Sequence, residues 1–226
     1  MPLSRFVATF FDLDVATAYA PQIFLGLVTT IAIGVAIVIT GLTVGLALAV
    51  VRALRIRSVN IVLIQIVDIL RALPPLVIIL IIYFGLPNVG IVIPSAVVLW
   101  MSLSAVLAAF AEEVYWAGIT SIPIGQWMAA RSTGLTFLQT LREVILPQAL
   151  RLAIPPLTNR TISITKNTAL GSAIGVNEIL GQSISAEAFS ANATPLTMAA
   201  VLYVLLFIPL VIASRSLERR YGVRRR

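Results

Sequence analysis

The stretch GQWMAARSTGLTFLQTLREVILP, residues 125–147, is weakly hydrophobic and carries arginine between two strongly apolar regions. Its landmarks have a fixed spacing: Ala129 and Ala130, three residues, Gly134, nine residues, Val144, one residue, then Leu146 and Pro147. Paired alanines let a helix approach another surface closely, a glycine favours the left-handed conformation that ends a helix, and proline interrupts one. We therefore predict a short helix here that fits a groove on a partner protein, with an ordinary amphipathic connector as the alternative.

The composition indicates an integral membrane protein. Of the 226 residues, 59% are hydrophobic and 11% are charged, and the mean hydropathy is +1.03. The formal net charge is +7, and the placement of the arginines around apolar segments explains it better than nucleic-acid binding does. The chain has no Cys and no His, so we expect no disulfide and no metal site.

Membrane crossings of about 20 apolar residues are the main organising feature of the sequence. We predict five of them, at approximately Ile23–Val51, Val59–Phe84, Ile91–Ala111, Leu152–Ile174 and Leu196–Ala213. Arginines gather after the first span, in the long insert and in the C-terminal tail. Because cytoplasmic connections are enriched in Lys and Arg, we expect the N-terminus outside and the C-terminus in the cytoplasm.

A single membrane domain is expected to cover residues 1–226. Residues 1–21 are predicted to form a short helix at the outer interface and not a cleavable signal, because Asp12 and Asp14 interrupt them. Residues 112–147 are expected to be a cytoplasmic coupling region. Residues 214–226 form a basic cytoplasmic tail, which we interpret as a topology anchor.

The spacing described above resembles the EAA loop of ABC-transporter permeases, in which E-A-A is followed at the same distances by G, I and L-P. Met128 stands where that family usually has Glu. Further segments resemble the polar amino-acid uptake branch of these permeases: GLVTTIAIG from Gly26, ILRALPPLVIILIIYFGLP from Ile69, AEEVYWAGITSIPIGQW from Ala111, and ILPQALRLAIPPLTNRTISITKNTALGSAIG from Ile145 to Gly175. The resemblance thus covers most of the chain.

This resemblance implies an all-α bundle of five transmembrane helices with a cytoplasmic coupling helix, the fold of type I ABC importers. It implies a bacterial inner-membrane permease that imports a polar amino acid by alternating access. The implied partners are ABC ATPase subunits, an identical or paralogous permease subunit, an extracytoplasmic amino-acid-binding protein and membrane lipid, and no nucleic acid. The implied coupling residues are Met128, Ala129, Ala130, Gly134, Leu146 and Pro147.

The chain lacks a nucleotide-binding signature of its own. Its single lysine, Lys166, follows TISIT and not a glycine-rich loop, so a G-x-x-x-x-G-K-[ST] cradle is absent. We therefore expect no catalytic residue and no bound cofactor in this chain, with ATP and Mg²⁺ on the partner ATPase. An intramembrane enzyme is disfavoured, because no nucleophile motif or metal-ligand cluster is present.

The fourth predicted span is polar enough to border a substrate path. Asn159, Ser163 and Lys166 fall at i, i+4 and i+7 and share one helical face, and Asn167 follows. An ammonium group with amide and hydroxyl donors suits the carboxylate of an amino acid. The alternative is that these groups only bond neighbouring spans and that Lys166 pairs with an acid. We also expect the adjacent prolines at 155 and 156 to break this helix.

Asp68 and Arg71 are two further candidates for the substrate path, in the second predicted span. Their i, i+3 spacing favours an ion pair, because an unpaired charge in a bilayer is costly. Glu112 and Glu113 end the third predicted span, where we expect them to interact with the arginine cluster. The alternative function for the whole chain is an ATP-independent channel or secondary carrier, which leaves the spacing of the 125–147 insert unexplained. Which amino acid is carried stays open.

Overall fold

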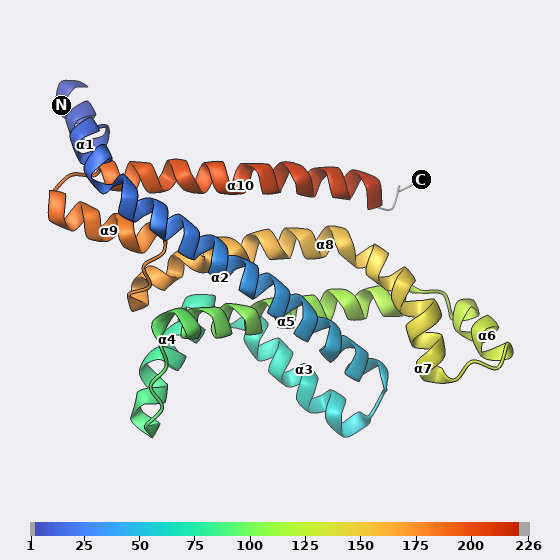
Figure 1. Ribbon diagram of the computed structural model, residues 1–226. Coiled ribbons are helices and arrows are strands. Elements are labelled where there is room, and N and C mark those ends of the chain that lie inside the picture. The colour runs from blue at the N-terminus through green and yellow to red at the C-terminus, as the bar shows by residue number, and fades with distance from the viewer. Residues whose placement is uncertain (1–2, 222–226) are drawn as a thin grey trace.

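The computed structural model describes residues 3–221, and all the regular elements in that range are helices (Figure 1). In chain order they are α1 (Leu3–Phe10), α2 (Leu13–Ala53), α3 (Arg57–Ala72), α4 (Pro75–Gly85), the 3₁₀ helix η1 (Leu86–Val89), α5 (Ser95–Ser121), α6 (Ile124–Ser132), α7 (Phe137–Gln139), the π-helix η2 (Thr140–Ile145), α8 (Leu146–Lys166), the 3₁₀ helix η3 (Asn167–Ile174), α9 (Ile179–Ser190) and α10 (Thr194–Tyr221).

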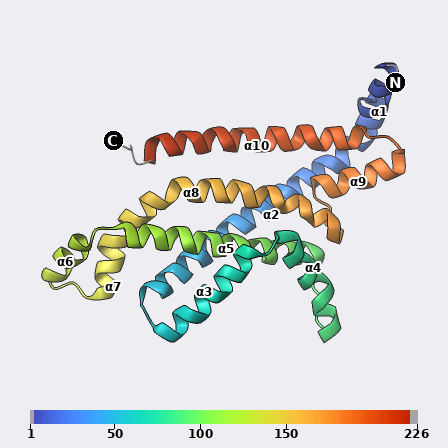
Figure 2. The same ribbon diagram turned by 180° about the vertical axis from the view of Figure 1, so that it is seen from behind.

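Helix α5 is the centre of the bundle. It packs along α2 and α8 and also contacts α3 and α4, whereas α10 packs on α8, α9 and α2. Figures 1 and 2 show α10 on the side of α8 that is remote from α5. At one end of the molecule lie α6, α7, the α2–α3 link and the end of α10, and at the opposite end lie α1 and α9 (Figure 1).

Two glycines allow α2 to approach α5 closely. A Cβ atom at position 45 would lie 2.6 Å from the Cβ of Ala111, and one at position 41 would lie 2.8 Å from the side chain of Leu107. Neither distance is tolerated by packed carbon atoms, so side chains larger than hydrogen would push the two helices apart. Gly41 and Gly45, four residues apart on α2, therefore mark a close contact between the two helices.

The predicted second span, Val59–Phe84, is not one straight helix. It is divided into α3 and the α4–η1 pair, which are bent by 104° relative to each other. The residue before a proline is pushed away from helical geometry, and Leu73 and Pro74 are extended, with ψ values of 138° and 134°. The helix breaks at this point for that reason, and α4 projects sideways from the bundle (Figures 1 and 2).

Three helical stretches in the described residues are long and apolar enough to cross a membrane: Leu3–Ala53, Ser95–Ser121 and Thr194–Arg219. The bent α3–α4 pair gives a fourth crossing if it counts as one span. The predicted fourth span corresponds to α8 and η3, which are too polar for that criterion. Helix α8 nevertheless has 21 residues, a length of about 32 Å, and lies between α5 and α10.

The boundaries of several predicted segments differ from the structure. Asp12 caps the N-terminus of α2, so residues 13–21, predicted to lie at the interface, continue into the first long helix. The predicted break at Pro155 and Pro156 is wrong, because α8 runs through both prolines. Packing against α5 and α10 stabilises the helix on each side. The residues between the fourth and fifth predicted spans contain α9.

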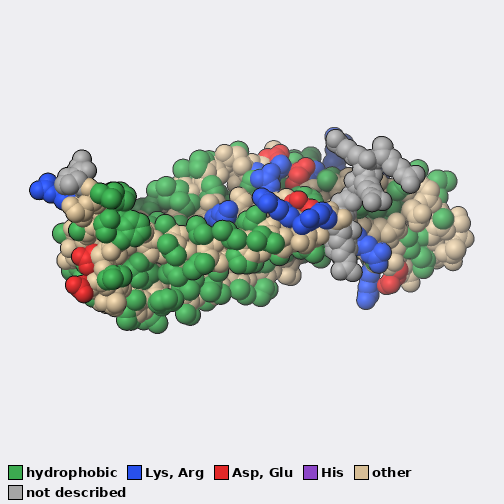
Figure 3. All heavy atoms as spheres, turned by 90° about the horizontal axis from the view of Figure 1, so that it is seen from above, with side chains coloured by type: hydrophobic (Ala, Val, Ile, Leu, Met, Phe, Trp, Pro, Cys, Tyr) green, Lys and Arg blue, Asp and Glu red, His purple; other side chains and the backbone are tan. Residues whose placement is uncertain are grey.

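Charged side chains are unevenly distributed over the surface. The face seen in Figure 3 is hydrophobic over much of its length; basic and acidic side chains gather over one half of it, and a few lie at the opposite end. A long apolar surface of this kind suits contact with lipid tails or with other membrane helices.

Candidate functional site

Helix α6 carries the paired alanines and lies at the extreme end of the molecule (Figure 1). It begins two residues after α5, behind Pro123. Met128 is 64% exposed and Ala129 is also exposed, but Ala130 is only 8% exposed and faces its own chain. Only one of the two alanines is therefore free to contact a partner, whereas the sequence had suggested that both would do so.

Gly134 ends this segment in the way the sequence predicts. Its φ angle is +90°, which is open to glycine and strained for other residues. Its amide donates a hydrogen bond of 3.1 Å to the carbonyl of Arg131, at the end of α6. No atom lies near the position of a Cβ, so the backbone conformation and not crowding accounts for glycine here.

The chain returns from α6 to the bundle through a fixed turn. The Thr136 hydroxyl accepts a hydrogen bond from the amide of Gln139, whose side chain accepts one from the Thr136 amide. The next turn is the π-helix η2, in which the amide of Leu146 donates to the carbonyl of Leu141. This wider turn accommodates Pro147, which lies in the first turn of α8 and does not interrupt the helical path as the sequence suggested.

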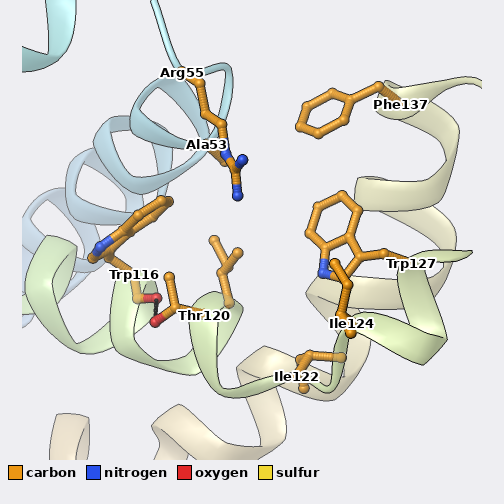
Figure 4. Close-up of a pocket in the computed structure, with 9 residues that line it drawn as sticks. Ala53, Arg55, Trp116, Thr120, Ile122, Ile124, Trp127 and Phe137 are labelled. Carbon is orange, nitrogen blue, oxygen red and sulfur yellow. Dashed lines mark hydrogen bonds between the residues drawn. The ribbon is translucent and has the colours of Figure 1, made fainter. Parts of the chain in front are cut away.

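A cavity of about 440 Å³ lies between α6 and the rest of the bundle (Figure 4). Trp127 of α6 stacks on Phe137 of α7 with their ring centroids 5.4 Å apart, and Trp116 of α5 faces them from the other side. Arg55, from the α2–α3 link, extends into the space between these aromatic rings. Helix α6 is thus packed on α7 through the stack of Trp127 and Phe137. The cavity beside this stack is lined by aromatic rings and has Arg55 at its edge.

Three predicted path residues of α8 share a second, polar pocket. Asn159, Ser163 and Lys166 border a space of about 320 Å³ whose other wall is α10. The Asn159 amide donates to the Glu218 carboxylate at 2.6 Å and accepts from the Ser214 hydroxyl at 3.1 Å. The predicted common face is therefore present.

Lys166 has no carboxylate within 4.0 Å among the side chains that the structure describes, so the predicted alternative of an ion pair is not found there. Its ammonium lies 5.7 Å from the ring centre of Phe207. Asn167 begins η3 and does not border the polar pocket. Arg215 also lines the pocket, which thus offers an ammonium, a guanidinium, an amide and hydroxyl groups beside one carboxylate, a set that can bind a zwitterion.

Asp68 and Arg71 lie apart from this pocket, within an ion-pair network. Arg71 is 3.5 Å from the Asp68 carboxylate, as the sequence predicts, but its shorter contact is with Glu113, at 2.8 Å. Asp68 is 62% exposed. The network joins α3 to α5, so the observed role of Arg71 is to stabilise the contact between these two helices.

The same network continues to α2. The Arg52 guanidinium, 14% exposed, is 3.0 Å from the fully buried Glu112 carboxylate and 3.9 Å from Glu113, and it lies 4.8 Å from the ring centre of Trp116. The expected interaction of the two glutamates with the arginine cluster is confirmed. Buried charges need such partners, because removing an ion from water is costly.

Sequence reasoning missed a buried carboxylate at the opposite end. Glu178 accepts hydrogen bonds from the Leu180 and Gly181 amides at the start of α9 and from the Tyr203 hydroxyl at 2.6 Å. Burial raises the pKa of Glu178 above its ordinary value, and these hydrogen bonds oppose the shift. Glu178 lies between the fourth and fifth predicted spans, where it is a buried helix cap that joins α9 to α10.

Residues of α10 were also missed, because Ser214, Arg215 and Glu218 were assigned to the tail. The signal was present: the serine and the glutamate are four residues apart and share a helical face if the last helix continues.

No group of three or more acidic, His or Cys side chains that could hold a metal ion occurs within the described part of the chain.

Comparison with known proteins identifies relatives over nearly the whole chain. Residues 41–223 match the family described as binding-protein-dependent transport system inner membrane component. The L-cystine transport system permease protein TcyB of Bacillus subtilis is 34% identical over 211 residues, 91% of this chain and 89% of that protein. The probable amino-acid ABC transporter permease protein YckA of the same organism is 32% identical over 170 residues, 75% of each chain. A crystal structure of an amino acid ABC transporter with histidines superposes with a TM-score of 0.83 at 29% identity, covering 92% of this chain and 98% of that one.

Proposed function

This chain belongs to the family of binding-protein-dependent transport system inner membrane components, and we propose that it is the subunit through which an ABC importer carries a polar amino acid. Membership makes it a multi-pass inner-membrane transport component that works with an ATPase partner. The observation that carries the proposal is α6: a short helix at one end of the bundle, with Met128 and Ala129 exposed and Gly134 in a conformation suited to glycine.

The finer parts of the proposal follow from this arrangement. The ATPase pair docks on α6 at the cytoplasmic end, with the C-terminus on the same side and the N-terminus outside, in agreement with the arginine distribution. A second permease chain, identical or paralogous, completes the transporter, and an extracytoplasmic binding protein delivers substrate at the end that carries α9. This chain holds no ATP or Mg²⁺, which bind the ATPase.

The amino acid passes along the polar face of α8. Lys166 supplies a cation for the substrate carboxylate, and Asn159 and Ser163 supply hydrogen-bonding groups beside it. Alternating access follows from movement of α6 and α7, which are joined to α5 and α8 through short connections. The roles of Asp68 and Arg71 are structural in this scheme, through Glu113.

Reconstitution tests the proposal. Proteoliposomes would contain this chain with candidate ATPase, second permease and binding-protein subunits, and ATP hydrolysis and uptake would be measured against a panel of amino acids. We expect uptake that requires ATP and stimulation of hydrolysis by one charge class of substrate. Omitting the ATPase is the control. Uptake by this chain alone under an ion gradient would overturn the proposal in favour of a secondary carrier.

A further inference from the structure

We propose that the aromatic cavity between α2, α5, α6 and α7 binds the headgroup of one anionic phospholipid of the cytoplasmic leaflet. The proposal uses the orientation given above and is otherwise independent of transport. The cavity opens to the surface, since its lining includes the exposed side chains Arg55, Thr120 and Ile124. Its volume of about 440 Å³ accommodates a phosphate with its glycerol and neighbouring headgroup atoms.

The chemistry of the cavity matches an amphiphile with a phosphate. Arg55 extends between Trp116 and the stacked pair Trp127 and Phe137 (Figure 4). Among the described side chains, no carboxylate lies within 4.0 Å of Arg55. A guanidinium binds phosphate through paired hydrogen bonds, and tryptophan rings favour the level of lipid headgroups. The cavity therefore combines one phosphate-binding cation with walls suited to glycerol and the first acyl carbons.

The α2–α3 link indicates that the partner is a lipid. Leu54 and Ile56 are exposed and alternate with Arg55 and Arg57. Exposed apolar side chains alternating with arginine are unfavourable in water but suit the boundary between headgroups and acyl chains, where anionic lipids attract the cations. The link is therefore placed at the depth where a phospholipid phosphate reaches Arg55.

The backbone at Arg55 supplies a second, independent observation. Its φ angle is +57°, a left-handed conformation just after the end of α2, where glycine is the usual residue. Arginine is disfavoured here on conformational grounds. Its presence in a strained conformation, with the side chain directed into a cavity, points to a binding role for the guanidinium.

Native mass spectrometry of the full chain in detergent tests this inference, with added palmitoyl-oleoyl phosphatidylglycerol or the matching phosphatidylcholine as probes. We expect one phosphatidylglycerol to be retained in preference to phosphatidylcholine. Arg55→Gly relieves the backbone conformation, so the fold is kept, and it should weaken phosphatidylglycerol retention about fivefold. Arg57→Gln removes an equal charge two residues away and should leave the preference nearly unchanged. Thr120→Phe fills the cavity without altering charge and should reduce retention as Arg55→Gly does.

Several outcomes would overturn the inference. Equal effects of Arg55→Gly and Arg57→Gln would mean diffuse attraction and no site. Displacement of the lipid by millimolar inorganic phosphate would mean a simple anion site. Arg55-dependent binding of the purified ATPase partner that displaces the lipid would make the cavity a docking surface for protein. None of these outcomes bears on whether the chain transports amino acids, because the measurement needs no transport.

Discussion

Replacing each of the paired alanines by phenylalanine should give opposite results, although they are neighbours. Ala130 is 8% exposed, so a benzyl group there has to be forced into packed structure, at a cost of about 1–3 kcal/mol. For a chain of this size, that lowers the unfolding temperature by roughly 2–12 °C. Ala129 is exposed, and surface substitutions usually change stability by no more than about 0.5 kcal/mol. Ala129→Phe should therefore unfold within about 2 °C of the parent.

The variant that keeps its stability, Ala129→Phe, should be the one that loses coupling to the ATPase directly. Because Ala129 is exposed beside Met128, we expect a phenylalanine there to obstruct the proposed docking of the ATPase while the permease stays folded. Thermal unfolding in detergent, co-purification with the ATPase and substrate-stimulated ATP hydrolysis measure the two effects. Full ATPase coupling in Ala129→Phe would refute the docking role of α6, and equal thermal destabilisation by both variants would refute the orientation of that helix.

Three further changes have definite expected outcomes. Gly134→Val places a β-branched residue at φ +90°, at a cost of about 1–2 kcal/mol, and should abolish uptake while the affinity of the binding protein for substrate is unchanged; retained uptake would contradict the coupling role. Glu112→Gln leaves the Arg52 charge without its closest partner, and we expect it to lower the free energy of chemical unfolding by about 3 kcal/mol. This is the low end for a broken buried pair, because Glu113 stays at 3.9 Å from Arg52. The double change of Arg52 and Glu112 to Met should recover part of the lost stability. Lys166→Met should lower the uptake rate at least tenfold with normal folding and ATPase assembly, and unaltered uptake kinetics would remove Lys166 from the substrate path.

Hydropathy and motif spacing predict the parts of this fold that depend on local sequence. Helices α2, α5 and α10 follow from apolar length, and α6 with its left-handed Gly134 follows from the spacing in the 125–147 insert. The position of the bend before α4 was equally visible in the LPP sequence at Leu73. An average over a window of hydropathy cannot register it, because such an average reports how apolar a segment is and not the direction of its backbone.

The polar pocket depends on contacts between helices distant in sequence, and these are harder to predict. The i, i+4, i+7 pattern identifies Asn159, Ser163 and Lys166, but it does not say which helix faces them. The basic composition of residues 214–226 predicts a tail and gives no role to Glu218, whereas α10 continues to Tyr221 and brings Glu218 to Asn159. Glu178 was missed for another reason: an acid in a short segment looks solvated until its three hydrogen-bond donors are placed in space.

The connections of α6 and α7 explain how docking at one end could act on the pocket. Only two residues join α5 to α6, and α7 continues through η2 into α8 without a break, so a displacement of the coupling segment is applied to both α5 and α8. The network around Glu112 and Glu113 resists movement of α5 relative to α2 and α3. Among the described side chains no ion pair joins α8 to α10, and the polar contacts between the two helices are the hydrogen bonds of Asn159 with Ser214 and Glu218. A push on α6 is therefore expected to shift α8 against α10 more readily than α5 against α2, and it is the α8–α10 boundary that holds Lys166 and Asn159.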